Sequence, residues 1–472
     1  MIRRFIAPLL VCGAVCGCAG SSEGRQSTAS GTAVPALGTG TSSSAPAITT
    51  SSAATSVVVT TPPSSSSSTP TTIAGGPPIS LASTLVLNGT SYTYCADADQ
   101  DPDGDGWGWT GSASCVVRDG RTDTNGNGSA VPGPIDLAGV QVAENLVNPK
   151  ATQGTLAVYR YLTSIYGKQI LSGQQDLTWD DSIDMRQRVI DDTGRWPAML
   201  GFDLMNYPYS PFTQDAGPGQ QQIEEAIAQW ERGGLVTICW HWRDPQGTSA
   251  SFYAADTAFR IPMNGVELDR SSVAFTEIEA DVDYIALQLK RLQDAGVPVL
   301  WRPLHEAAGG WFWWGGARSD ATTAAEAQIA LYRYMFDRLT NFHGLNNLIW
   351  VWNGQANSWY PGDAYVDIIG QDLYGEANDY GSKRVSFSRT LMYDTADKMI
   401  ALTENGSIPD PERILDDNAW WLYFLTWNDG AGAAGETNEN NFWTGEYHNS
   451  NVHKRYVFNH SLVVTLEELP VW

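Results

Sequence analysis

The chain has 472 residues, 42% of them hydrophobic, which is enough for about two or three domains and a substantial core. Its formal net charge of −24 disfavours nucleic acid and anionic membrane surfaces as partners, because like charges would repel. A neutral polymer is compatible with that charge. The 19 tryptophans exceed what core packing usually requires, and they indicate surfaces on which a flat apolar ligand stacks.

The first 18 residues have the pattern of a targeting segment. Two arginines precede a short apolar run, residues 5–15, which is too short to span a bilayer as a helix. The sequence Val15-Cys-Gly-Cys resembles a bacterial lipoprotein cleavage box, with Cys18 as the lipidated residue. An ordinary signal peptide cut nearby is the alternative. Both interpretations predict an exported protein, and lipidation would anchor it in the cell envelope, at the outer membrane or the cell surface.

Residues 19–83 consist mostly of Ser, Thr, Ala, Gly and Pro, a composition that cannot bury a core. We therefore expect a disordered linker. As a flexible coil of about 60 residues it would span roughly 40–45 Å root-mean-square, which suits a protein that searches for a bulky polymer.

A small module is predicted over residues 84–120, and a second polar linker follows over residues 121–140. Cys95 and Cys115 are a plausible disulfide pair in an oxidising compartment. The module's Gly106-Trp-Gly-Trp109, followed by Ser114-Cys115, resembles small disulfide-bonded modules attached to bacterial polysaccharide-degrading enzymes. Trp107 and Trp109 either stack on sugar or form the module's whole core.

Four aspartates of this module alternate as the ligands of calcium loops do, with a glycine at the sixth position. They are Asp99, Asp101, Asp103 and Asp105. The twelfth position is Thr110, where such loops have a bidentate glutamate. A structural calcium ion and a solvated acidic loop therefore both stay open.

The main domain is predicted over residues 141–472, where short apolar runs alternate with helical patterns such as 222–232 and 282–295. Eight runs separated by crossovers predict an α/β fold, the parallel (β/α)8 barrel. The runs are 169–172, 198–202, 235–239, 297–301, 347–352, 366–370, 399–402 and 423–426. We expect residues 243–276 to form an elaborated loop over the barrel mouth.

Polar and aromatic residues repeatedly follow the apolar runs. In a (β/α)8 barrel the chemistry lies at the C-terminal ends of the strands. The residues at these ends are Gln174, Gln175, Asp176, Asp203, His241, His305, Glu306, Asn353, Asp372, Tyr374, Glu404 and Trp427. The sequence therefore predicts one site at this end of the barrel.

Two carboxylates stand out at the predicted mouth. Glu306 follows the fourth run, beside the aromatic cluster 311–314, and Glu404 ends the seventh run. Strands four and seven lie across the mouth from each other, so their side chains can face one another over a cleft. Glycoside hydrolysis needs such a pair, an acid that protonates the leaving oxygen and a carboxylate on the other side of the sugar. The aromatic setting should raise the pKa of Glu306, whereas Glu404 should stay ionised, with the Tyr374 hydroxyl orienting it.

The segment Trp301-Arg-Pro-Leu-His-Glu306, followed by Gly309-Gly-Trp-Phe-Trp-Trp-Gly315, resembles the acid/base motif of the family 26 glycoside hydrolases. Further matching segments occur in order from about residue 153 to the C-terminus. They are Ile170-Leu-Ser-Gly-Gln-Gln-Asp176, Gly234-Leu-Val-Thr-Ile-Cys-Trp-His-Trp242, Gly370-Gln-Asp-Leu-Tyr-Gly375 and Leu402-Thr-Glu-Asn-Gly406. The best-known members of this family are endo-β-1,4-mannanases.

The resemblance implies a retaining mechanism with Glu306 as acid/base and Glu404 as nucleophile. It also implies that His241 binds sugar at the cleaved bond, although a buried structural histidine is the alternative. Arg302 is expected to fix carboxylate geometry, and His305 to lie behind Glu306. Asp372 is expected to bind a sugar hydroxyl or hold Arg302, and Trp311 and Trp427 to stack on sugar.

Some positions depart from the family pattern. Gln175 stands where a histidine is expected, Ala307-Ala308 where a pair containing asparagine is frequent, and Trp427-Asn-Asp429 lacks a basic residue. These departures leave the reaction class intact but put the outer sugar contacts, and the tolerance of galactose branches, in doubt.

The sequence thus predicts a retaining endo-β-1,4-mannanase, most simply a monomer, that acts on mannan, glucomannan or galactomannan without a catalytic cofactor. The alternatives are a β-1,3-xylanase or mixed-linkage glucanase of the same family, a non-catalytic carbohydrate-binding barrel, and a chain whose functional unit is a calcium-stabilised adhesion module. The presence of both glutamates argues against a non-catalytic barrel. Contact with a membrane is expected only through the lipid anchor.

Overall fold

The structure of the chain, a computed structural model, describes residues 84–87, 90–94, 107–109, 114–116, 134–137, 140–178, 183–208, 221–393, 395, 398–430 and 438–472. In the first four segments only the backbone is described. The predicted targeting segment, the linker over 19–83, Cys18, Cys95 and the aspartates of the acidic loop lie outside these residues. The Cys95–Cys115 disulfide and the calcium ion therefore stay predictions.

The first four segments form a small sheet of their own, in the order β1-β2-β4-β3. Its strands are β1 (Thr84–Leu87), β2 (Thr90–Tyr94), β3 (Trp107–Trp109) and β4 (Ser114–Val116). Strands β2 and β4 run parallel, with Thr93 opposite Cys115, and the other pairings are antiparallel.

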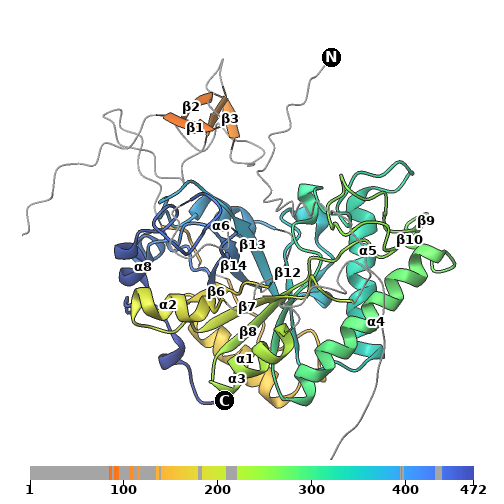
Figure 1. Ribbon diagram of the computed structural model, residues 1–472, viewed down its shortest axis with the longest axis horizontal. Coiled ribbons are helices and arrows are strands. Elements are labelled where there is room, and N and C mark those ends of the chain that lie inside the picture. The colour runs from red at the N-terminus through yellow and green to blue at the C-terminus, as the bar shows by residue number, and fades with distance from the viewer. Residues whose placement is uncertain are drawn as a thin grey trace, which may run out of the picture. The chain divides into compact units, whose positions relative to one another are not determined.

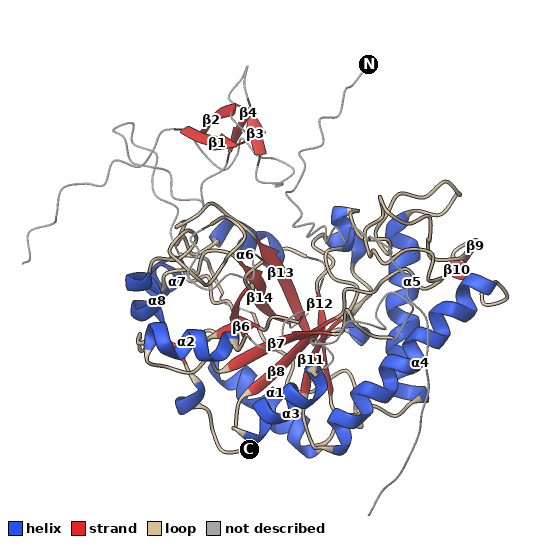
Figure 2. Ribbon diagram, in the orientation of Figure 1, coloured by secondary structure: helices blue, strands red, loops and turns tan. Residues whose placement is uncertain are grey.

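Eight parallel strands of the main domain close into a barrel in the order β11-β12-β13-β14-β15-β6-β7-β8, which confirms the predicted fold class. In chain order they are β6 (Gly173–Gln175), β7 (Met199–Asp203), β8 (Leu235–Cys239), β11 (Val299–Arg302), β12 (Leu348–Trp352), β13 (Ile368–Leu373), β14 (Met399–Asn405) and β15 (Phe424–Thr426). Figures 1 and 2 show these strands at the centre of the domain with the helices around them.

The helices are α1 (Gln153–Ile165), α2 (Met185–Thr193), α3 (Gln222–Glu231), α4 (Val273–Asp294), α5 (Ala324–Phe336), α6 (Arg384–Leu391), α7 (Pro411–Asp417) and α8 (Asn451–Phe458). A π-helical turn, Asp337–Phe342, continues α5. Among the described residues, no helix combines the length and the apolar character that crossing a membrane requires.

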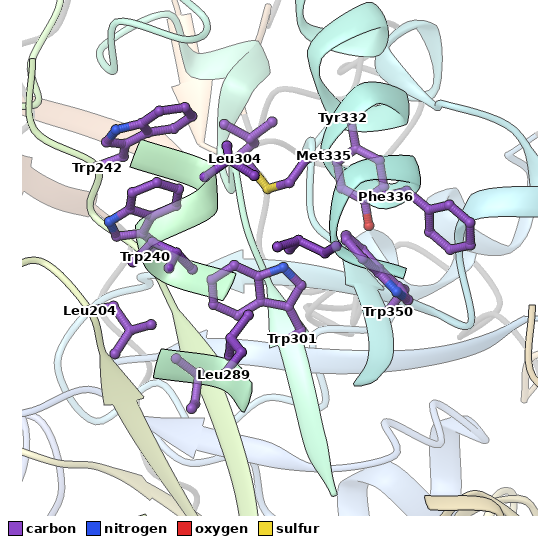
Figure 3. Packing of buried hydrophobic residues seen from close by; sticks show 14 of the residues in the cluster. Leu204, Trp240, Trp242, Leu289, Trp301, Leu304, Tyr332, Met335, Phe336 and Trp350 are labelled. Atoms are coloured by element: carbon purple, nitrogen blue, oxygen red, sulfur yellow. The ribbon is translucent and has the colours of Figure 1, made fainter. Parts of the chain in front are cut away.

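Side chains alternate between the barrel interior and the helix layer with the period of two that strands impose. On β11, Leu300 belongs to the interior cluster and Trp301 to the outer one; on β12, Ile349 and Trp350 divide in the same way. Figure 3 shows Trp301 and Trp350 packed with side chains of the surrounding helices. Burial of this apolar surface, at about 25 cal/mol per Å², is the main term that favours the fold.

The first strand differs from the prediction. The run 169–172 contributes only β5 (Ile170–Leu171), which pairs with β16 (Val463–Val464) in a separate two-stranded sheet. The barrel strand is the polar segment β6 that follows, and its Gln174 and Gln175 side chains are buried. An apolar run could not mark this strand because glutamines occupy it.

Two other boundaries also differ. Helix α4 begins at Val273 rather than at 282, because Ser272 caps it by accepting from the backbone N–H of Phe275 at 3.1 Å. The loop that follows β8 therefore ends at 272, and it carries a short hairpin of β9 (Met263–Asn264) and β10 (Glu267–Leu268). The crossover from β12 to β13, described throughout, contains the 3₁₀ turns Asn357–Trp359 and Asp363–Tyr365 instead of an α-helix.

Asp367, directly before β13, joins the N-terminal segment to the barrel. Its buried carboxylate accepts from the backbone N–H groups of Val147 and Trp350, both at 2.8 Å. Asp367→Ala should lower the free energy of unfolding by about 2–4 kcal/mol, because two buried N–H groups lose their acceptor.

Urea denaturation measures this loss. Asp294→Ala, which removes an exposed carboxylate paired with Lys290, is the matched control and should cost less than about 1 kcal/mol. Equal losses in the two variants would contradict the role given to Asp367.

Candidate active site

Strand alternation brings four polar side chains to one layer at the barrel mouth. Each lies an even number of residues after an interior residue of its own strand. The pairs are Met199 and Asp203, Leu235 and Cys239, Leu300 and Arg302, and Ile368 and Asp372. The mouth therefore follows from the same period of two that builds the core.

Glu404 reaches this layer because of an irregularity in its strand, β14. On the neighbouring strand Gln371 lies opposite Leu402 and Asp372 lies opposite Glu404, so β14 has one extra residue, Thr403. Simple alternation from the interior Ala401 would turn Glu404 outward. The β-bulge at Thr403 aims Glu404 into the mouth instead.

The guanidinium of Arg302 bridges two carboxylates. It donates to Asp372 at 2.8 Å and to Glu404, and its side chain is 1% exposed. Thr403 donates to the other oxygen of Asp372 at 2.5 Å, and the Tyr374 hydroxyl donates to Glu404 at 2.6 Å. Arg302, Asp372 and Tyr374 thus surround Glu404 as the expected geometry required.

Glu306 lies four residues beyond the end of β11, in a tight turn. Its φ is 53° and that of Leu304 is 54°, left-handed conformations that cost about 1–2 kcal/mol each outside glycine. The backbone N–H of Glu306 donates to the Asn353 carbonyl at 2.7 Å, and the Trp311 indole N–H donates to the Glu306 carboxylate at 2.8 Å. Oxygens of Glu306, Asp372 and Glu404 lie within 4.8 Å of one another.

The two glutamates differ in their electrostatic surroundings. Burial, followed by the charges of Asp372 and Glu404, raises the pKa of Glu306 well above its usual range. Burial and Asp372 raise the pKa of Glu404 to about 7, whereas Arg302, His241 and Tyr374 oppose that rise. Burial thus opposes the expected ionisation of Glu404, and Arg302, His241 and Tyr374 favour it. Of the two, Glu306 nevertheless holds its proton more tightly, because Arg302 pairs directly with Glu404 and not with Glu306.

A chain of three side chains lies beside this pair. His241 makes a 2.6 Å hydrogen bond through Nδ1 with Asp203, and its Nε2 lies 3.2 Å from Nε2 of His305. Burial, followed by His241 and Arg302, holds the pKa of His305 well below its usual value. The pairing of Asp203 with His241 was not predicted, although Asp203 lies in phase with interior residues at a strand end.

The aromatic residues 311–314 fall into two groups, one that is partly exposed at the mouth and one that belongs to the core. Phe312, Trp313 and Trp314 are buried, and the two indoles donate to the backbone carbonyls of Trp242 and His305. Trp311 is only partly buried and lies against Gly309, where a Cβ would come 2.1 Å from its ring. Trp427, also partly buried, has its ring 5.9 Å from that of His241.

Among the described residues, two groups of side chains have the spacing of metal ligands. One is Glu306, Asp372 and Glu404, but the Arg302 cation already occupies the space between two of its members. The other is Asp203, Cys239 and His241, in which His241 Nδ1 is bonded to Asp203 and burial raises the pKa of the Cys239 thiol. Neither group is suited to hold a metal ion.

A (β/α)8 barrel with two carboxylates facing each other at the C-terminal end of its strands has the arrangement that glycoside hydrolysis requires. The chain belongs to glycosyl hydrolase family 26, whose model matches residues 147–468.

Known proteins agree with this assignment. The chain is 41% identical over 340 residues to a mannan endo-1,4-beta-mannosidase of Thermothelomyces thermophilus, a match that covers 70% of this chain and 64% of that protein. It is 33% identical over 335 residues to mannan endo-1,4-beta-mannosidase B of a Piromyces species, covering 69% and 53%. The chain thus spans between half and two thirds of the length of these curated relatives.

Solved structures share the fold. The GH26-CBM35 β-(1,4)-mannanase of Podospora anserina matches with a TM-score of 0.60 and 36% identity, over 72% of this chain and 71% of that one. A β-mannanase from a symbiotic protist of the termite Reticulitermes speratus, complexed with gluco-manno-oligosaccharide, matches with a TM-score of 0.60 and 31% identity, over 70% and 99%.

Arg302→Met should destabilise the fold by about 3–5 kcal/mol, because Asp372 and Glu404 would stay buried without a cation. The folded-state pKa of Glu404 already exceeds its unfolded value of about 4.3, and loss of Arg302 raises it further. A raised carboxyl pKa removes stability as pH rises from the unfolded pKa to the folded one. The loss should therefore be larger at pH 8 than at pH 5.

Urea denaturation at the two pH values measures the effect. Arg291→Met, which breaks an exposed pair with Glu224, is the control and should cost less than about 1 kcal/mol at both. A loss in Arg302→Met that is independent of pH would contradict the electrostatic explanation.

Proposed function

We propose that the chain is a retaining endo-β-1,4-mannanase that cleaves internal bonds of mannan, glucomannan or galactomannan. The observation that carries the proposal is the pair of Glu306 and Glu404, whose carboxylate oxygens lie within 4.8 Å in unlike surroundings. Retaining glycosidases have carboxyl groups about 5–5.5 Å apart, whereas inverting enzymes leave room for a water molecule. Relatives named mannan endo-1,4-beta-mannosidase, and the gluco-manno-oligosaccharide bound by a related structure, support the choice of substrate.

In the first step Glu404 attacks the anomeric carbon while Glu306 gives its proton to the leaving glycosidic oxygen. The bond from carbon to that oxygen breaks and a glycosyl ester of Glu404 forms. In the second step Glu306 takes a proton from water, whose oxygen attacks the anomeric carbon and releases Glu404. Two inversions leave the anomeric configuration unchanged.

The surrounding residues would support this sequence of protonation states. Arg302 and Tyr374 favour the ionised Glu404 that must attack, and Asp372 holds Arg302 in place. Glu306 lacks such a cation and retains the proton that it must donate. His241, oriented by Asp203, and the partly buried Trp311 and Trp427 would bind sugar, with His305 behind His241.

A hydrolysis panel tests the substrate. Mannan, glucomannan, β-1,3-xylan and lichenan should be compared, with products followed by chromatography. We expect a ladder of oligosaccharides from mannan and glucomannan. Release from β-1,3-xylan alone would favour the xylanase alternative, release from lichenan alone the glucanase, and binding without release a non-catalytic barrel.

Glu404→Ala should lower kcat by several orders of magnitude, since no other group can form the covalent bond. Glu306→Ala should lower kcat/KM by about 10²–10⁴-fold on mannan but much less on an aryl mannobioside with a good leaving group, which departs without a proton. Added azide should restore turnover of the aryl mannobioside by Glu306→Ala, because azide attacks the glycosyl-enzyme and gives a β-glycosyl azide.

Glu231→Ala, an exposed change at the end of α3, serves as the control and should keep full activity. Near-normal turnover of mannan by either active-site variant would overturn the assignment. Circular dichroism checks that both variants are folded.

The parts of the chain that precede the barrel enter the same proposal. Export, lipidation of Cys18 and a tether over residues 19–83 would hold a monomeric barrel at the cell envelope. Cys95 and Cys115 would form a disulfide, and Asp99, Asp101, Asp103 and Asp105 a calcium site, in the small module. Mass spectrometry of the mature chain tests lipid and disulfide. The melting temperature of the full chain should be measured with and without calcium. An unchanged melting temperature would contradict the proposed calcium site.

A further inference from the structure

The loop between β8 and α4, residues 240–272, is joined to the turn that carries Trp311. Tyr253 and Phe312 form an isolated antiparallel bridge, and their rings stack with centroids 5.6 Å apart. The backbone N–H of Ala254 donates to the Trp311 carbonyl at 2.6 Å, and that of Trp313 donates to the Phe252 carbonyl at 3.0 Å. Trp311 is therefore held by its backbone to a loop that begins on a neighbouring strand.

Arg260 fastens the same loop from the other side. Its guanidinium donates to four backbone carbonyls, those of Ala254 at 3.1 Å, Thr257 at 2.9 Å, Phe259 at 2.6 Å and Ala317 at 3.0 Å. The first three belong to the loop, and Ala317 belongs to the end of the turn that carries Trp311. Within the described part of the chain, no carboxylate pairs with Arg260, and four of its five N–H donors bind backbone carbonyls.

One residue, Ala254, connects Arg260 to Trp311 through its two backbone groups. The carbonyl of Ala254 accepts from Arg260, and its N–H donates to the carbonyl of Trp311. The indole N–H of Trp311 in turn donates to the Glu306 carboxylate at 2.8 Å. Three hydrogen bonds, joined through the residues Ala254 and Trp311, thus connect Arg260 to the proposed general acid.

Two glycines make room for this arrangement. A Cβ on Gly316 would come 2.9 Å from Nε of Arg260, and a Cβ on Gly309 would come 2.1 Å from the Trp311 ring. Either atom would push aside a side chain of the series. The close packing limits both groups to one position.

We propose that Arg260 is a positioning residue for the general acid, because it fixes the loop that holds the Trp311 indole N–H against one oxygen of Glu306. That oxygen is occupied as an acceptor, so the proton of Glu306 resides on the other oxygen, the one free to meet the glycosidic bond. The proposal rests on the proposed function of Glu306. It gives the loop over the mouth a part in catalysis that requires no contact with sugar.

The groups around Glu306 decide the direction in which its pKa moves when the Trp311 hydrogen bond is lost. Burial, Asp372 and Glu404 raise its pKa, and the Trp311 indole and Arg302 lower it. Loss of the indole hydrogen bond therefore raises the pKa of Glu306 further and makes it a weaker acid. The alkaline limb of the pH profile of kcat/KM should move to higher pH, while the rate at the optimum falls.

The test compares Arg260→Met with wild type on two substrates. Mannotetraose needs a proton on its leaving oxygen, whereas 2,4-dinitrophenyl β-mannobioside does not. We expect kcat/KM on mannotetraose to fall about tenfold or more, kcat/KM on the aryl substrate, which reports only formation of the glycosyl-enzyme, to stay within about twofold, and the alkaline limb to move up in pH. Equal losses on the two substrates, or an unmoved alkaline limb, would overturn the proposal.

Matched variants separate positioning from a general loosening of the loop. Arg318→Met also removes one hydrogen bond to the loop, the one that Arg318 donates to the Ile261 carbonyl. It leaves the bonds of Ala254 and Trp311 intact, so its loss of activity should be the same on both substrates. Trp311→Phe should reproduce the leaving-group dependence of Arg260→Met, and the double variant should be no slower than Trp311→Phe alone. Additive losses would refute the series of contacts.

Folding and function are controlled separately. If Arg260→Met does not fold by circular dichroism, Arg260→Lys carries the test, since an ammonium group can satisfy part of the four carbonyls. The indole N–H resonance of Trp311, assigned by its absence in Trp311→Phe, should shift in Arg260→Met. Absence of any mannan hydrolysis by wild type would refute the proposed function, whereas an unshifted indole resonance would refute the positioning.

Discussion

The buried guanidinium of Arg302 is the interaction on which the mouth of the barrel depends. It joins β11 to β13 and β14 through Asp372 and Glu404 at a depth where each charge alone would be costly. Two carboxylates share one cation, which cannot neutralise both when they are ionised. Both act on Glu306, which lies within 4.8 Å and pairs with no cation among the described residues. One ion pair thereby gives two identical side chains different affinities for a proton.

Most of this arrangement could be predicted from the sequence because it repeats. Eight apolar runs with helical segments between them require a barrel, and strand alternation then places Arg302 and Asp372 at the mouth. The order of the strands sets Glu306 opposite Glu404. The resemblance to family 26 added roles to residues whose positions the pattern had already indicated.

The features that were not predicted are those that depart from the regular alternation of apolar strands and helices. The bulge at Thr403 reverses the side to which Glu404 points, and an extra residue in one strand leaves no mark in hydrophobicity. The first barrel strand is Gly-Gln-Gln, polar in sequence and buried in the fold. The partners of Arg260 are backbone carbonyls, which every residue has, so no residue type could reveal them. Contacts of side chains to backbone between loops require coordinates.

The difference between strand and loop also explains how the two glutamates are held in position. Glu404 lies within a strand and is fixed by the sheet, by Arg302 and by Tyr374. Glu306 lies in a turn with a left-handed backbone, so other loops must define its position. Asn353 holds its backbone and Trp311 its carboxylate, and Trp311 depends in turn on the loop that Arg260 fastens. A nucleophile needs only to stay ionised and face one carbon atom, whereas an acid that later acts as a base must present the same oxygen twice. Under the proposed mechanism Glu306 has the more exacting task, and the barrel strands support it less than they support Glu404. The loop over residues 240–272 supplies support that the strands do not.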